Sequence, residues 1–99
     1  MPLYPVGKFK INESQKLRDK GLLIIGERVE GSISVNDYIS FNDGATQETL
    51  KILGIEDFIT VSGVHLTGLI FQYNSFEDQK KYESLKLTLQ MAEVSAYLT

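Results

Sequence analysis

Apolar and polar residues alternate along much of the chain, and this spacing predicts strands. In a half-buried strand every second side chain faces the core, whereas the apolar positions of a helix recur with a period of about 3.6 residues. The clearest alternation places Leu85, Leu87, Leu89 and Met91 on one face, which predicts a one-sided strand. Residues 22–25 are apolar at every position. They predict a central strand that is covered on both faces.

Turn residues divide the segment 26–41 into two short strands. Gly26 ends the apolar run, and Gly31 follows a charged step. Asn36 and Asp37 form the next turn signal, because Asn and Gly adopt the positive φ of a tight reversal at low cost. We therefore expect structural turns at these positions, with strands between them.

Three further segments complete the pattern. The alternation slips by one position between Ile52 and Leu53, beside Gly54, and such a slip indicates a β-bulge or a sharp bend. The polar stretch 12–20 predicts a loop. The polar stretch 75–84 begins with a capping pattern and predicts a short helix or helical turn.

The chain is long enough for one hydrophobic core. With 99 residues, residues 1–99 are expected to form a single domain. The fold class that the pattern predicts is all-β: a single small β-barrel of about six to seven mostly antiparallel strands. No internal repeat or linker-like composition divides it.

Composition and charge narrow the classes of partner. Ten Lys and Arg against thirteen Asp and Glu give a formal net charge of -3, which disfavours binding to DNA and non-specific binding to RNA. The small basic cluster of Lys16, Arg18 and Lys20 would release too few counterions to hold a duplex. The chain has no cysteine, and it shows neither a signal peptide nor an apolar run that could span a membrane. We expect a soluble cytoplasmic protein.

Residues that could support catalysis or bind a metal are few. His65 is the single histidine, and without cysteine a zinc site would need carboxylates to complete it. The carboxylates of Glu56 and Asp57, like those of Glu77 and Asp78, are adjacent in sequence, so in a strand each pair would point to opposite faces. No serine lies in a nucleophile motif. We expect neither an enzyme nor a bound cofactor or metal.

The aromatic residues fall into two groups. Tyr38 and Tyr73 neighbour turn or polar residues, so they are the candidates for exposed aromatic side chains on a binding surface, with an exposed sheet edge beside Tyr38. Four phenylalanines occupy apolar registers and are assigned to the core: Phe9, Phe41, Phe58 and Phe71.

Glycines and apolar residues follow a characteristic spacing in the first half of the chain: Gly21, Gly26, Gly31, Ile33, Val35, Asp37 and Ile39. This pattern resembles the second domain of translation elongation factors of the Tu type, a β-barrel that follows the GTP-binding domain. Asn36 stands where that family has the Gly of a Gly-Asp pair. The chain contains no Gly-x-x-x-x-Gly-Lys phosphate-binding loop, so a GTPase is not expected.

A second segment extends the resemblance. Residues 54–58 read Gly-Ile-Glu-Asp-Phe, similar to the Gly-Val-Glu-Met-Phe of the family, and Gly63 and an apolar strand around Gly68 follow. In that family the Glu lies against the terminal adenosine of aminoacylated tRNA, so the resemblance implies such a role for Glu56. Ile59 stands near the position of an accompanying family Arg.

Three functional hypotheses remain open at this point. The first is a non-catalytic module that binds another protein or a second copy of itself. The alternative is a module that binds a nucleotide or a tRNA-like RNA end through Glu56. An enzyme whose site is built from carboxylates ranks last.

Overall fold

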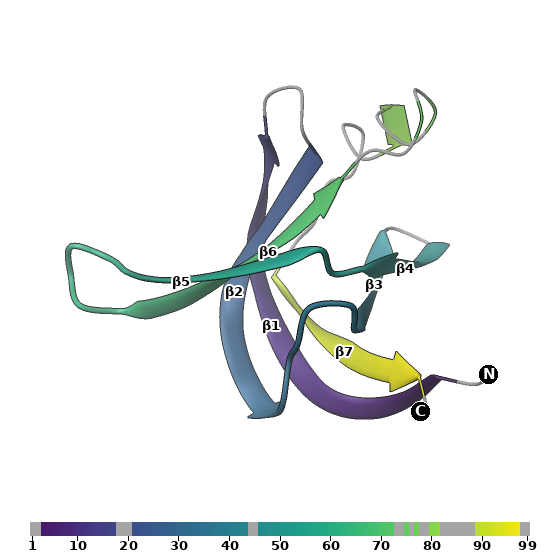
Figure 1. Ribbon diagram of the computed structural model, residues 1–99. Helices are drawn as coiled ribbons and strands as arrows, with labels where there is room; N and C mark the ends of the chain where they lie inside the picture. Colours follow the sequence, from purple (N-terminus) through teal and green to yellow (C-terminus); the bar gives the residue numbers. More distant parts are fainter. Residues whose placement is uncertain are drawn as a thin grey trace.

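Seven strands make up the fold that the computed structural model describes for residues 3–17, 21–43, 46–72, 75, 77, 80–81 and 89–97. They are β1 (Leu3–Leu17), β2 (Gly21–Gly31), β3 (Tyr38–Asp43), β4 (Thr46–Lys51), β5 (Gly54–Ile59), β6 (His65–Gln72) and β7 (Gln90–Tyr97) (Figure 1). All pair antiparallel in one sheet of order β4-β3-β7-β1-β2-β6-β5. The predicted all-β class is confirmed.

The sheet is strongly curved but is not closed into the predicted barrel. Its two edges, β4 and β5, are consecutive in sequence, and no ladder joins them within the described residues. At the junction, the Ile52 N–H donates to Asp37 O (2.8 Å) and Ile52 O accepts from the Asn36 N–H (2.8 Å), whereas the Leu53 N–H donates to Ile70 O (2.9 Å). One bent segment therefore leaves β3 and joins β6, so its two halves become the two edges instead of pairing.

This bend accounts for the slip in the apolar pattern beside Gly54. Ile52 is fully buried, while the next side chain, Leu53, is 39% exposed. The chain changes its pairing partner between these two residues, and the face that points to the core changes with it. The structure thus places a sharp bend at the position where the sequence allowed either a bulge or a bend.

Two other predicted boundaries change. The predicted loop 12–20 is wrong up to Leu17, because β1 continues to that residue and pairs with β2 as far as Gly21. A register shift between Ile11 and Glu13 accommodates Asn12. Apolar residues at the start of β2 supply a pairing partner, so the polar end of β1 remains extended.

The predicted helix falls mostly outside the described residues. Within 75–84 only Ser75, Glu77, Lys80 and Lys81 are described, and the last three have helical backbone geometry. Most of the predicted strand 85–91 also lies outside them. At its described end the predicted core face is wrong, because Leu89 and Met91 are exposed, whereas Ala92 and Val94 of β7 are buried. Among the described residues no helix is long and apolar enough to cross a membrane.

The core consists of side chains that alternate along five of the strands and cover one face of the sheet, together with Leu50 of β4. Ile33 and Ile52, in the connections after β2 and β4, add to them. Strand β5 contributes only Ile55, which is partly buried against this cluster. Buried members are Phe9, Ile11, Leu22, Ile24, Ile33, Ile39, Phe41, Leu50, Ile52, Leu69, Phe71, Ala92 and Val94. The strand β5 is thus attached to the body mainly through its ladder with β6.

Candidate functional site

The hairpin formed by β5 and β6 projects from the body of the sheet (Figure 1). Its connection is fixed by hydrogen bonds: the Thr60 N–H donates to Val64 O (2.9 Å), and the Gly63 N–H donates to Thr60 O (2.9 Å). The Val64 N–H also donates to the Thr60 hydroxyl (3.1 Å). Gly63 has a φ of 86°, a conformation that glycine adopts without a steric penalty. The hairpin therefore has a defined turn at its end.

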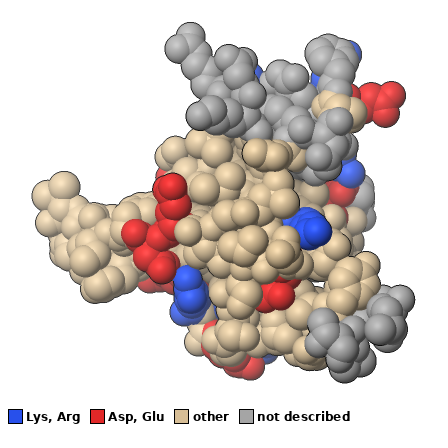
Figure 2. Space-filling model, viewed as in Figure 1, with Lys and Arg blue, Asp and Glu red and all other residues tan. Residues whose placement is uncertain are grey.

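The outer part of this hairpin exposes apolar side chains. Phe58 is 39% exposed, Ile59 61%, Val61 110% and Val64 45%, and we call these four residues the apolar tip. No Lys, Arg, Asp or Glu occurs between residues 58 and 66. In Figure 2 the projecting end is accordingly tan, and acidic side chains gather where it meets the body. Exposed apolar surface of this kind is common at sites where proteins bind other molecules.

The position of Phe58 corrects one prediction. The alternation assigned this residue to the core, but it is exposed. Phe58 lies three positions from Ile55, whose side chain packs against the core, so in the unbroken ladder with β6 it points to the opposite face. The other three phenylalanines that were assigned to the core are buried there.

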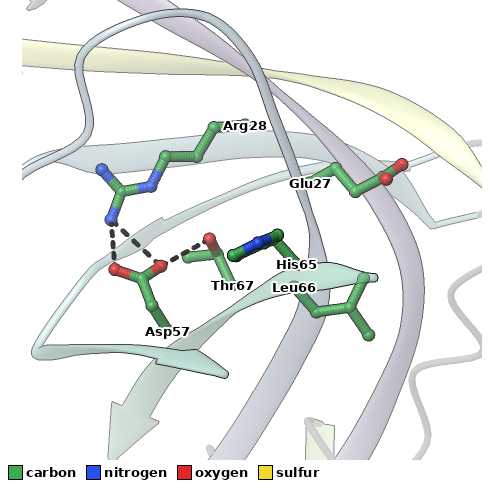
Figure 3. Close-up of a pocket in the computed structure, with 6 residues that line it drawn as sticks. All are labelled: Glu27, Arg28, Asp57, His65, Leu66 and Thr67. Atoms are coloured by element: carbon green, nitrogen blue, oxygen red, sulfur yellow. Dashed lines mark hydrogen bonds and ion pairs between the residues drawn. The ribbon is translucent and has the colours of Figure 1, made fainter. Parts of the chain in front are cut away.

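A pocket of about 410 Å³ lies at the base of the hairpin. It is lined by Glu27, Arg28, Asp57, His65, Leu66 and Thr67 (Figure 3). The Asp57 carboxylate accepts a hydrogen bond from the hydroxyl of Thr67 (2.7 Å) and lies 3.3 Å from Arg28 Nη2. The Thr67 side chain is buried, whereas both charged partners are exposed. These contacts link β2, β6 and β5 where the hairpin leaves the body.

The arrangement of these groups favours a structural role for the pocket. Arg28 and Thr67 already bind the Asp57 carboxylate, which leaves it poorly placed to act as a base or a ligand. No cluster of three or more metal-ligating side chains occurs in the described part of the chain. Glu27 pairs loosely with Lys10 across the β1–β2 ladder, at 4.0 Å. The charged groups around the pocket thus neutralise one another.

The two predicted binding residues that the structure describes, Glu56 and Tyr38, lie on strands that do not pair with each other. Glu56 lies on β5, exposed, opposite Gly68 of β6. Tyr38 is half-buried and packs edge-to-face on Tyr97, with ring centroids 5.2 Å apart. The predicted edge beside Tyr38 is wrong, because β3 pairs with β4 on one side and with β7 on the other. Tyr73 lies outside the described residues, and a binding role for Tyr38 stays a prediction.

The predicted turn residues occupy different kinds of position. Gly31 and Asn36 have φ values of 74° and 77°. The Asp37 carboxylate accepts a hydrogen bond from the Ser34 N–H (2.9 Å) and so closes the turn before β3. Gly54 begins β5. Gly26 lies inside β2, not in a turn.

Sequence reasoning did not single out the apolar tip or the contact between Arg28 and Asp57. A signal for the tip was present, since Val61 and Val64 flank a Ser-Gly turn where polar residues are usual. The ion pair joins residues that are 29 positions apart. Such a contact depends on which strands are neighbours, and local patterns do not give that order.

Comparison with known proteins adds no further assignment. No protein-family model, no curated protein sequence and no solved structure matches the chain.

Proposed function

We propose that this chain is a protein-interaction module that binds its partner through the hairpin of β5 and β6. The observation that carries this proposal is the apolar tip on a projecting hairpin with a hydrogen-bonded turn. A fixed turn reduces the loss of conformational entropy that accompanies binding. Burial of the tip would contribute hydrophobic free energy in proportion to the apolar area removed from water.

The charge of the hairpin favours a protein over a nucleic acid. Residues 54–72 contain no Lys or Arg, and Arg28, the cation at its base, is paired with Asp57. Recognition of a phosphate backbone depends on cations. A tRNA-like RNA end at Glu56 therefore has less support than a protein partner.

Site-specific photocrosslinking tests the proposal. A photoreactive phenylalanine analogue replaces Val61 at the tip, and a control variant carries it at Lys8, an exposed residue of β1. In cells that express the chain, we expect a discrete protein adduct from position 61 and none from position 8. The partner identified by mass spectrometry should then bind the purified chain, and Ile59→Lys should weaken that binding at least about tenfold.

Two results would count against the proposal. Equal adducts from both positions would mean that contact is non-specific. No adduct from position 61, together with RNA crosslinked near Glu56, would favour the nucleic-acid alternative. An adduct of twice the mass of the chain would identify the partner as a second copy.

A further inference from the structure

We propose that the outer edge of β5 accepts an added β-strand from the partner, and that this strand places a Lys or Arg opposite Glu56 and an apolar residue opposite Phe58. This inference rests on the proposed function and specifies the chemistry of the partner at the same hairpin. It depends on three features of β5. These are the unpaired backbone groups along its outer side, the exposed carboxylate of Glu56, and the repulsion between the carboxylates of two copies of the strand.

The backbone of β5 presents hydrogen-bonding groups on the side away from β6. The Thr60 N–H donates to Val64 O, and the ladder runs from there to Gly54 opposite Ile70 without a register shift. Hydrogen-bonded and non-hydrogen-bonded pairs alternate in an antiparallel ladder. The N–H and C=O groups of Ile55, Asp57 and Ile59 therefore point outward, where no strand of the described chain pairs with them.

The side chains of β5 have different partners on the two faces of the strand. Asp57 is bound by Arg28 and Thr67. Glu56 points to the opposite face, is exposed, and has no ion pair within the described residues. Phe58 shares the face of Glu56, because side chains two positions apart lie on the same side of a strand. An added strand would thus meet a free carboxylate and, two residues on, an exposed aromatic ring.

Cross-strand pairing then selects the partner chemistry. Opposite charges that face each other across a ladder stabilise it, as do pairs of aromatic and β-branched residues, whereas like charges destabilise it. The best match is an extended segment with a basic residue and an apolar residue two positions apart. The net charge of -3 would also attract a basic segment over longer distances.

A second copy of β5 is a poor occupant of the same edge. In an antiparallel pair the outward-pointing residues of one copy must face outward-pointing residues of the other. The two registers with the longest overlap therefore place Glu56 opposite Glu56, or Asp57 opposite Asp57. Each of these registers brings carboxylates together, so the edge disfavours self-pairing and leaves a basic segment as the complementary partner.

Two synthetic peptides test the charge preference. One is Thr-Val-Thr-Lys-Thr-Val-Thr with blocked ends, which presents valine two positions from lysine in either strand direction. Its control has Glu in place of Lys. Titrated to about 5 mM into the ¹⁵N-labelled chain, the lysine peptide should shift the amide signals of Ile55, Asp57 and Ile59 saturably. We expect the control peptide to bind about three- to tenfold more weakly.

The Glu56→Lys variant should reverse this order of the two peptides. Equal binding of both peptides to the unmodified chain, or no binding of either, would overturn the inference. An unchanged order in the variant would do the same, since the preference would then arise elsewhere.

A backbone test separates strand addition from contact through side chains alone. Ile59→Pro removes an outward N–H and leaves the ladder with β6 complete, whereas Ile59→Ala keeps that N–H. The lysine peptide should bind the alanine variant and not the proline variant. Methylation of the backbone nitrogens of the peptide tests the same bonds without altering the protein, and it should abolish the shifts. Binding that survives both changes would exclude an added strand.

The experiments distinguish this inference from the proposed function. Adducts from position 61 combined with no peptide preference would overturn the basic strand alone and leave the interaction module in place. Absence of adducts would overturn the module itself. Sedimentation that shows a dimer, with shifts at Ile55, Asp57 and Ile59 upon dilution, would replace the basic segment by a second copy.

Discussion

Truncation of the two adjacent residues at the bend should have very different effects on stability. Ile52 is fully buried in the core cluster, and Leu53 is 39% exposed. Changing either residue to alanine removes the same number of carbon atoms. At about 0.8 kcal/mol per buried CH₂ group plus a cavity term, Ile52→Ala should lower the free energy of unfolding by about 2.5 to 4 kcal/mol. Leu53→Ala should cost less than about 1 kcal/mol.

The backbone hydrogen bonds at the bend make this a clean comparison. The bonds between Ile52 and the Asn36–Asp37 turn involve only main-chain atoms, so alanine keeps them and the measured loss reports the side chain. Urea denaturation followed by circular dichroism gives both free energies, and Ile52→Ala should also lower the melting temperature by about 10 to 25 °C. Equal losses in the two variants, or a larger loss for Leu53→Ala, would refute the change of face at this bend.

Three further predictions test the strand contacts and one turn. A Cβ atom added at Gly26 would lie 1.9 Å from a backbone oxygen of β1, so Gly26→Ala should cost more than about 3 kcal/mol in thermal unfolding. Gly54→Ala, whose Cβ would meet only the side chain of Ile70, at 3.3 Å or more, should cost less than about 1 kcal/mol. A double-mutant cycle on Arg28 and Asp57 should give a coupling of about 0.2 to 1 kcal/mol that disappears in about 1 M salt, because the pair is exposed. Asn36→Gly should retain stability, while Asn36→Ala should cost about 1 kcal/mol at a φ of 77°; equal losses would exclude backbone conformation as the cause.

Much of the fold could be predicted because the core follows simple alternation. In five of the strands the buried residues occur as pairs two positions apart, for example Phe9 with Ile11 and Ile39 with Phe41. The turn at Asn36 could also be predicted from the local sequence, because a backbone position with positive φ favours Asn or Gly. Such features depend on neighbouring residues alone, and the sequence displays them directly.

Features that depend on long-range pairing could not be predicted in the same way. The edge position was expected beside Tyr38, but a strand becomes an edge only through the order of the whole sheet. The polar end of β1 is extended because β2 pairs with it. The candidate site has the same origin: Phe58 is exposed because it lies on the face of β5 opposite to Ile55 and the core, and which face is covered depends on how β5 pairs with β6.

The carboxylates on β5 protect this exposed edge against aggregation and also determine which partner strand it prefers. An unpaired strand bearing apolar residues invites aggregation, and charged residues on the edge are a common protection. Glu56 and Asp57 both serve this purpose against a second copy, but the two carboxylates differ in what they leave available. Asp57 is bound within the chain by Arg28 and Thr67. Glu56 is therefore the carboxylate that remains to distinguish a basic partner strand from an acidic one. The change in relative affinity for the lysine and glutamate peptides in the Glu56→Lys variant measures how strongly it does so.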